Sequence, residues 1–191
     1  MRKIVNSTYI TLDGVVEGPH LWPSTGRPGD QRAGEIQTGL LLSCDAVLMG
    51  RRTYDGFAPV WPTRSGDPYS DRINAMPKYV VSTTLEQPAW NNTHVIAGDP
   101  VGEITRLKQA EGKDIVQYGF GAVTRLLLDH DLLDELRLWV HPLILGTGDP
   151  SDLLFGAAPA IGFRLTDATT LSDGIVILSY ETDERLARDA A

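Results

Sequence analysis

Short segments of the chain carry apolar side chains at regular intervals, and the interval distinguishes strands from helices. Runs dominated by β-branched and aromatic residues, bounded by Gly, Pro, Asn or Asp, are typical of strands. The sequence predicts strands at residues 3–12, 46–49, 78–83, 93–97, 114–118, 136–145, 163–171 and 175–181. The last two segments are separated by Ser172, Asp173 and Gly174, which is typical of a hairpin.

Other segments have apolar residues spaced for one face of a helix. Helices are predicted at 31–43 and 51–57, and Pro100 begins another at the position where its missing N–H costs least. The expected buried face of that helix consists of Val101, Ile104, Leu107 and Lys108. The last helix begins at Gly119-Phe120-Gly121, and its expected buried face consists of Val123, Leu126, Leu127 and His130.

Strands that alternate with helices, followed by a hairpin, predict a single α/β domain over residues 1–182. Its central sheet is expected to be mixed and mostly parallel, flanked by helices, with an antiparallel C-terminal hairpin. Residues 13–30 are rich in Gly and Pro, and a loop of this length is usually kept for binding. Residues 183–191 form a charged C-terminal tail.

Charge limits the ligands that the chain can attract. The 17 Lys and Arg residues against 25 Asp and Glu give a net charge of −8, so any phosphate must be bound by local groups. The acidic balance and the lack of a basic stripe argue against nucleic acid as a partner. No apolar run suits a membrane span, and no signal-peptide pattern is evident, so we expect a cytoplasmic protein.

Side chains that bind metals or form disulfides are few. Cys44 is the one cysteine, and its apolar neighbours predict a buried, unreactive thiol. His20, His94, His130 and His141 lack metal-ligand spacing, so we predict no bound metal.

A first candidate for phosphate binding is Met49-Gly50-Arg51-Arg52-Thr53-Tyr54. Gly50 ends an apolar strand and allows close backbone approach, and the helix start that follows offers free N–H groups and a positive dipole end. Arg51 and Arg52 add charge-assisted hydrogen bonds to phosphate. The alternative is a strand-to-helix turn with solvated arginines.

A second candidate is the stretch 116–123, where a strand, Gly119 and Gly121 lead into a helix. Bare N–H groups without a Cβ in the way form the cradle that pyrophosphate needs. As a dinucleotide fingerprint it is weak, because Thr124 replaces the third glycine and no acidic residue ends a following strand. A structural glycine pair at a helix start is the alternative. Two such junctions in one α/β domain could face each other at the carboxyl ends of neighbouring strands.

Several motifs occur together in an order that resembles the dihydrofolate-reductase-like superfamily. They are Thr11-Leu12-Asp13-Gly14-Val15-Val16, residues 49–54, residues 78–85, Gly119-Phe120-Gly121, Leu145-Gly146-Thr147-Gly148 and Leu154-Phe155. The chain is most similar to the C-terminal reductase domain of the bacterial riboflavin-biosynthesis deaminase–reductase, over nearly its whole length. The resemblance implies a three-layer sandwich with NADPH lying across the carboxyl edge of the sheet.

The resemblance also implies which residues bind the cofactor. Its phosphates would contact Gly50, Arg51, Arg52 and Thr53. The adenosine ribose and 2′-phosphate would lie beside Ser82, Thr83 and Thr84. The pyrophosphate would be cradled by Tyr118, Gly119, Phe120, Gly121, Ala122 and Val123. Residues 13–22 would form a mobile loop over the nicotinamide. Relatives commonly carry an arginine in place of Thr83, which leaves the preference for NADPH over NADH open.

Catalytic and substrate-binding residues are less well marked. Folate reductases carry an acid on the helix before the Gly-Arg motif, so the resemblance favours Glu35, with Asp13 as a second candidate in the loop. The alternatives are solvated carboxylates for Glu35 and Asp30, a helix cap for Asp30, and a turn for Asp13. Trp22, Tyr54 and Trp61 could stack on a flat heterocycle, or pack as ordinary core and loop residues.

The function expected from these features is an NADPH-dependent reductase of a small pterin-like or 5-amino-6-(5-phosphoribosylamino)uracil-like substrate. A nucleotide-binding module without catalysis and a reductase of an unrelated small molecule remain open. The zinc deaminase pattern His-x-Glu…Pro-Cys-x-x-Cys is absent, so a stand-alone reductase is expected. The apolar strand at 136–145 and the related reductase domains suggest a homodimer.

Overall fold

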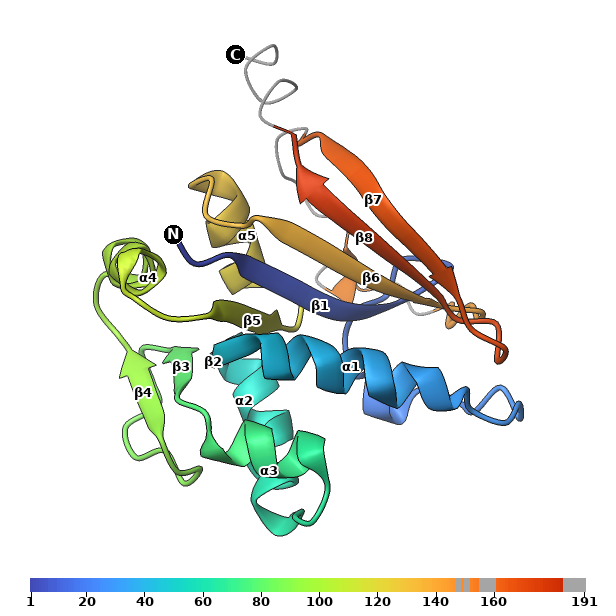
Figure 1. Ribbon diagram of the computed structural model, residues 1–191, viewed down its shortest axis with the longest axis horizontal. Coiled ribbons are helices and arrows are strands. Elements are labelled where there is room, and N and C mark those ends of the chain that lie inside the picture. The colour runs from blue at the N-terminus through green and yellow to red at the C-terminus, as the bar shows by residue number, and fades with distance from the viewer. Residues whose placement is uncertain (147–148, 150–151, 155–160, 184–191) are drawn as a thin grey trace.

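The chain folds around one eight-stranded sheet with the strand order β4-β3-β2-β5-β1-β6-β8-β7 (Figure 1). The computed structural model describes residues 1–146, 149, 152–154 and 161–183. The strands are β1 (Ile4–Thr11), β2 (Cys44–Gly50), β3 (Lys78–Val81), β4 (Thr93–Ile96), β5 (Asp114–Tyr118), β6 (Glu135–His141), β7 (Phe163–Thr170) and β8 (Val176–Thr182). The α-helices are α1 (Gln31–Ser43), α2 (Arg51–Phe57), α3 (Pro68–Ala75), α4 (Pro100–Gln109) and α5 (Ala122–Asp129), with short 3-10 turns η1 (Pro19–Leu21) and η2 (Trp61–Thr63).

Strand direction decides where a binding site can form. Every neighbouring pair from β4 through β6 in the sheet is parallel, whereas β8 pairs antiparallel with both β6 and β7. The carboxyl ends of the parallel strands therefore meet at one edge of the sheet, where open α/β proteins bind ligands. The predicted fold class, a mostly parallel mixed sheet with a C-terminal antiparallel hairpin, is confirmed.

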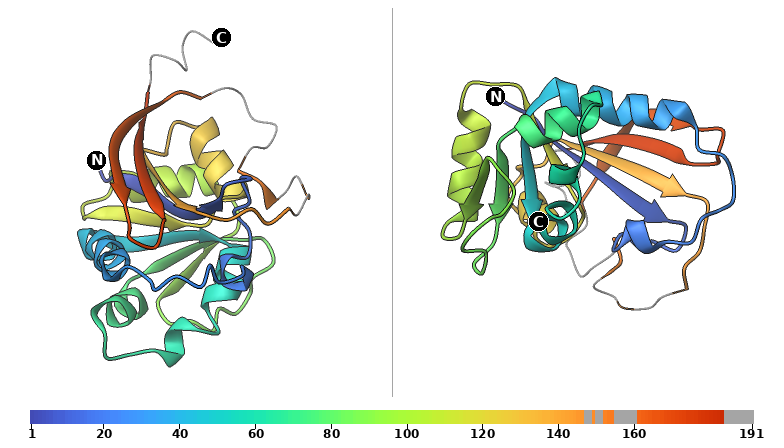
Figure 2. Two further views of the ribbon diagram at one scale, coloured as in Figure 1. Left: turned by 90° about the vertical axis from the view of Figure 1, so that its right-hand side faces the viewer. Right: turned by 90° about the horizontal axis from the view of Figure 1, so that it is seen from below.

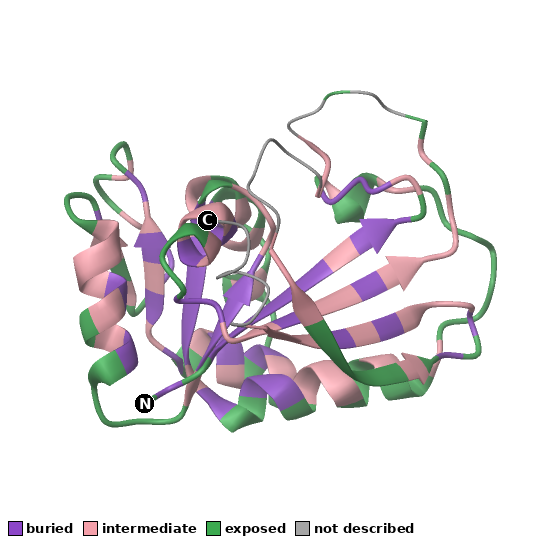
Figure 3. Cartoon of the chain, turned by 90° about the horizontal axis from the view of Figure 1, so that it is seen from above, coloured by how far each residue is buried: buried purple, intermediate pink, exposed green. Residues whose placement is uncertain are grey.

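Helices cover the sheet on two sides, which gives three layers (Figure 2). Alternate residues of the central strands explain this, because Val47 and Met49 pack with α1 and α3 while Ala46 and Leu48 pack with α4 and α5. Most residues of the central strands β1, β2 and β5 are buried, as Figure 3 shows. Both faces of β2 are therefore apolar, as expected for a parallel strand in the middle of a sheet.

Three details differ from the sequence predictions. Helix α3 was not expected, although Asp67 caps its first turn and Pro68 occupies its first position, which together are a known start signal. Strand β6 ends at His141 rather than at 145, because Pro142 has no N–H to continue the ladder. His130, predicted to face the core, is exposed at the end of α5.

Some sequence predictions cannot be placed. Thr147, Gly148 and Phe155 of the family motifs, and the tail from residue 184 onward, lie outside the described residues.

Candidate functional site

The two glycine-led junctions lie side by side at the carboxyl edge of the sheet. Strands β2 and β5 are parallel neighbours, with Met49 opposite Tyr118 in register, so the next residues of both strands emerge together. A Cβ on Gly50 would lie 3.2 Å from Cγ2 of Val123, and one on Gly119 would overlap the Thr53 hydroxyl. The predicted juxtaposition of the two junctions is confirmed.

The helices that begin at these junctions have no side-chain cap. Asp30, Asp67 and Asp99 cap α1, α3 and α4, whereas Gly50 and Gly121 precede α2 and α5 without a capping hydrogen bond. First-turn N–H groups of a helix need an acceptor from a cap, from water or from a ligand. Among the α-helices that the structure describes, α2 and α5 are thus the two whose first turns remain open to an anion.

The end of β3 continues the same row of groups. Gly50 pairs in register with Val81, so Ser82, Thr83 and Thr84 follow directly beside the first junction. Arg51 connects the two segments, since its Nη1 donates to Oγ1 of Thr84 over 3.1 Å. Its Nε donates to both carboxylate oxygens of Asp55 over 2.8 and 2.9 Å, which fixes the direction of the guanidinium. The predicted cofactor residues are therefore contiguous in space.

Buried polar side chains fix the Gly119 carbonyl. Three side chains donate to this oxygen: Asn6 Nδ2 over 2.9 Å, Gln117 Nε2 over 2.8 Å and Thr124 Oγ1 over 3.1 Å. All three side chains are essentially inaccessible to solvent. Thr124, which stands in place of the third fingerprint glycine, thus helps to hold Gly119 in its left-handed conformation at φ 81°.

Arg52 reaches toward the N-terminal loop. Its Nη1 lies 3.7 Å from Oε2 of Glu17, so the loop that follows β1 approaches the start of α2. Both side chains are largely exposed, and such a surface pair contributes little stability.

Asp13 connects the loops that follow β1 and β6. Its carboxylate accepts hydrogen bonds from the backbone N–H groups of Leu145 and Gly146, at 3.1 and 2.8 Å, and from the Thr11 hydroxyl. These bonds, that from Thr11 first, hold the pKa of Asp13 below its ordinary value. The group is therefore ionised at neutral pH and engaged by the loops, which gives it a structural role and makes it a poor proton donor.

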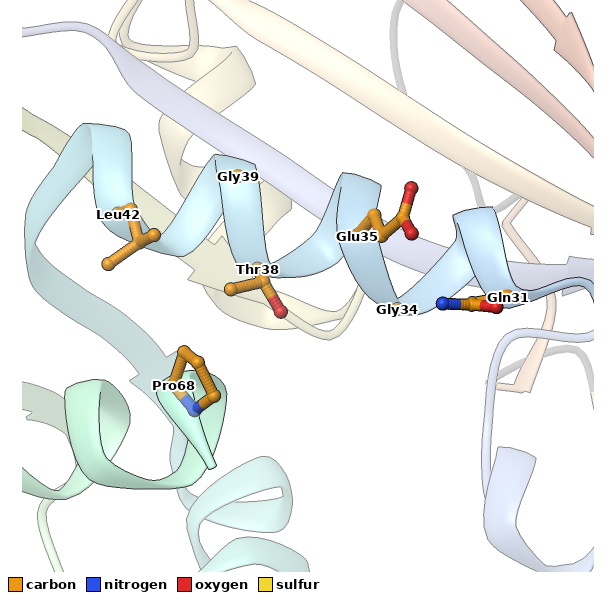
Figure 4. Close-up of a pocket in the computed structure, with 7 residues that line it drawn as sticks. All are labelled: Gln31, Gly34, Glu35, Thr38, Gly39, Leu42 and Pro68. Carbon is orange, nitrogen blue, oxygen red and sulfur yellow. The ribbon is translucent and has the colours of Figure 1, made fainter. Parts of the chain in front are cut away.

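Glu35 does not face the sheet, and its predicted catalytic position is wrong. Ile36, Leu40 and Leu41 turn the other face of α1 toward the core, so Glu35 is exposed on the opposite side of the helix. It borders a shallow hollow of about 520 Å³ between the outer face of α1 and Pro68, from which its side chain points away (Figure 4). The sequence prediction chose the wrong one of two neighbouring helix positions, because helical spacing alone does not tell which of them points toward the sheet.

The three aromatic residues predicted to stack on substrate have different surroundings. Tyr54 is only 4% exposed, and its hydroxyl accepts a hydrogen bond from the backbone N–H of Trp90, so it belongs to the core and that prediction is wrong. Trp22 lies edge-on to His141, with ring centroids 5.3 Å apart. Trp61 remains partly exposed and lies 5.0 Å from the ring of Tyr69.

A second hollow, of about 440 Å³, opens between α1, η2 and the start of α3. Its lining consists of Gly34, Gln37, Thr38, Trp61, Arg64, Asp67, Pro68, Tyr69 and Ser70. Tyr69 connects it to the sheet edge, since its hydroxyl lies 2.8 Å from that of Tyr118, the residue before Gly119. We call this hollow the α1–α3 hollow.

Sequence reasoning missed Gln37, Tyr9 and Tyr69. Gln37 Nε2 donates to the Tyr9 hydroxyl, which places both residues between α1 and the sheet. The alternation along β1 puts Ser7, Tyr9 and Thr11 on one face and could have pointed to Tyr9. Burial raises the pKa of Tyr9 and Tyr118, and raises that of Tyr69 to about 12, so these hydroxyls are protonated donors at neutral pH.

The described part of the chain has neither a metal-binding cluster nor a helix that could span a membrane. Within it, no group of three or more His, Cys, Asp or Glu side chains could hold a metal ion. None of its helices has the length and apolar character needed to cross a bilayer.

Comparison with known proteins shows what the chain is similar to. Residues 2–177 match the family model described as the RibD C-terminal domain. The chain is 28% identical over 195 residues to the uncharacterized protein YyaP of Bacillus subtilis, and the alignment covers 94% of each chain.

Solved structures show the same fold at low sequence identity. A putative riboflavin biosynthesis protein from Shewanella sp. PV-4 aligns with a TM-score of 0.69 and 23% identity, covering 96% of this chain and all of the other. A diaminohydroxyphosphoribosylaminopyrimidine deaminase/5-amino-6-(5-phosphoribosylamino)uracil reductase from Thermotoga maritima aligns with a TM-score of 0.65 and 16% identity. That alignment covers 95% of this chain but 57% of the Thermotoga protein.

Proposed function

The chain belongs to the RibD C-terminal domain family, and from this premise we propose that it is an NADPH-dependent reductase of a small heterocyclic substrate. The observation that carries the proposal is the pair of uncapped, glycine-led helix starts at the carboxyl ends of β2 and β5. A net charge of −8 gives no general attraction for a dinucleotide, so these local groups must supply it. Their free N–H groups and dipole ends suit phosphate oxygens.

Three neighbouring segments at this edge of the sheet would contact successive parts of a dinucleotide. Gly119 to Val123 would hold the pyrophosphate, and Gly50 to Thr53 would contact phosphate from the neighbouring strand. Ser82 to Thr84 would lie beside the adenosine ribose. Arg51, directed at Thr84 by Asp55, would supply the cation for a 2′-phosphate that Thr83 cannot provide. When bound, the reduced dinucleotide supplies the hydride, and the protein supplies orientation and electrostatics.

The substrate that we propose is a pterin-like or pyrimidine-like ring that accepts hydride at a C=N or C=O bond. The related Thermotoga protein is described as a 5-amino-6-(5-phosphoribosylamino)uracil reductase, so uracil-type compounds are the first to test. The α1–α3 hollow, with Trp61 among its lining residues and a volume of about 440 Å³, connects to the junction through Tyr69 and Tyr118, and we propose it as the place of this ring.

Titration with NADPH, followed by cofactor fluorescence, tests the proposal directly. We expect saturable binding by the native chain, and weaker binding by Arg51→Ala by about 1.5–3 kcal/mol, because a charged hydrogen bond is lost. The loss should be smaller for NADH, which has no 2′-phosphate. Asp55→Ala should also weaken NADPH binding, by less than Arg51→Ala, because the guanidinium keeps its charge but loses the carboxylate that directs it.

Arg164→Ala is the matched control, because this arginine also pairs with a carboxylate but lies on β7, the edge strand of the antiparallel hairpin. It should leave the affinity unchanged. An absence of NADPH binding by the native chain at millimolar concentration would end the proposal. An unchanged affinity of Arg51→Ala would show that the arginine has been given the wrong role.

A further inference from the structure

Three tyrosine side chains gather on the α1 face of the sheet next to the proposed cofactor site. Tyr118 ends β5, Tyr69 lies in the first turn of α3, and Tyr9 lies on β1, where its hydroxyl accepts a hydrogen bond from Gln37 of α1. Tyr118 is 8% exposed, whereas Tyr69 borders the α1–α3 hollow. The Tyr69–Tyr118 hydrogen bond therefore connects the lining of the hollow with the residue that precedes Gly119.

The Tyr69–Tyr118 pair keeps one hydrogen unused. The two oxygens are 2.8 Å apart and share one hydrogen bond, so one of the two O–H groups has no role in it. Among the described residues, no hydrogen bond from the Tyr118 hydroxyl to another acceptor is found. A buried donor without an acceptor costs free energy unless a ligand or water supplies one.

Charges around the α1–α3 hollow disfavour a cationic ligand. Asp67 is the only carboxylate among the residues that line it, and its Oδ1 accepts from the backbone N–H groups of Tyr69 and Ser70 at 3.1 and 2.9 Å. Arg64 lies 5.2 Å from the centroid of the Trp61 ring, so a positive charge already occupies one side of the hollow. Glu35, the acid expected on α1, faces away.

We propose that the Tyr69–Tyr118 pair binds an uncharged, carbonyl- or imine-bearing planar ring by donating its unused hydrogen to that oxygen or nitrogen. This inference rests on the proposed function and narrows its substrate class. The inference excludes rings that bind in a protonated form, which a site with a carboxylate would favour. Tyr9, held by Gln37, offers a second neutral donor on the same face.

The same donors would assist the reduction. A bound reduced dinucleotide would supply the hydride to the carbon of the C=O or C=N bond and would itself be oxidised, which would leave negative charge on the oxygen or nitrogen. The tyrosine hydroxyl stabilises this charge by hydrogen bonding until water supplies the proton. Donors directed at developing charge in a site screened from water are among the strongest contributions to catalysis.

Binding without turnover gives the first test. In the presence of oxidised NADP, calorimetry would compare uracil with 2,4-diaminopyrimidine in its protonated form on the native chain and on Tyr69→Phe, Tyr118→Phe and the double variant. We expect uracil to bind more tightly, and the double variant to bind it about tenfold more weakly, as for the loss of one hydrogen bond. Tighter binding of the diaminopyrimidine, lost in Asp67→Asn, would overturn the inference in favour of a carboxylate site.

Kinetics with a uracil-type substrate gives the second test. The double variant should lose kcat by about 100-fold, as when an oxyanion donor is removed, with its NADPH affinity retained. Tyr79→Phe is the control, because this tyrosine packs on the opposite face of the sheet. Unchanged kcat in variants that bind NADPH would overturn the inference and leave the proposed function standing. A native chain that binds no NADPH would overturn both.

Discussion

Gly119→Ala tests the closeness of the two junctions on which the site depends. Gly119 has φ 81°, a left-handed conformation that costs an L-residue about 1–2 kcal/mol. Its Cβ would also overlap the Thr53 hydroxyl, and such overpacking costs a further ~1–3 kcal/mol. Together these terms predict a loss of about 2–5 kcal/mol in the free energy of unfolding, or roughly 10 °C in Tm for a domain of this size.

Gly66→Ala separates the cost of the left-handed backbone from the cost of the steric overlap. Gly66 has a similar φ of 87°, but its Cβ would meet nothing within 4 Å, so only the backbone term of about 1–2 kcal/mol applies. Urea unfolding followed by circular dichroism would give both free energies on the same scale. The difference between the two variants measures the contact of Gly119 with Thr53.

Thr53→Ala completes a double-mutant cycle. Truncating Thr53 removes the hydroxyl that the new methyl group would strike, so Gly119→Ala should cost less stability in that background. If Gly119→Ala costs no more than Gly66→Ala, the β2 and β5 junctions are not in contact. The proposed dinucleotide site would then lose its geometric basis.

Further predictions concern single groups. Glu35→Gln should leave NADPH-dependent turnover unchanged in a steady-state assay, because the carboxylate is exposed on the outer face of α1. Asp13→Ala should lower Tm at neutral pH. The hydrogen bonds that lower the pKa of Asp13 in the folded chain stabilise its ionised form, so the difference in Tm from the native chain should shrink as pH falls below about 4. The pKa of Tyr69 is raised to about 12, so its protonated hydroxyl contributes fully to the free energy of unfolding below pH 10 and loses this contribution between pH 10 and 12. In urea unfolding across that window, the free energy of unfolding should fall more steeply for the native chain than for Tyr69→Phe. A homodimer is expected in sedimentation at micromolar concentration, because β7 is an exposed edge strand with Leu165 half-exposed, and a monomer would contradict it.

Local sequence determines most of the elements. The apolar runs at β2 and β5 are read directly as buried parallel strands, and Pro100 with the capping Asp99 marks the start of α4. Gly50 and Gly119 were recognisable as junctions because each ends an apolar run and precedes a helical pattern. Helix α3 was missed because its Gly/Pro-rich surroundings dominate a short segment with few buried residues.

Only the tertiary structure decides which side chains share a site. Strand order made β2 and β5 neighbours, and this brings together residues that are about seventy positions apart in sequence. Packing of α1 against the sheet turned Gln37 inward and Glu35 outward, and the position of α3 joined Tyr69 to Tyr118. Sequence periodicity reports the conformation of each element, because that depends on neighbouring residues. The pairing of distant elements depends on how all their apolar faces are buried together, and no single segment encodes it.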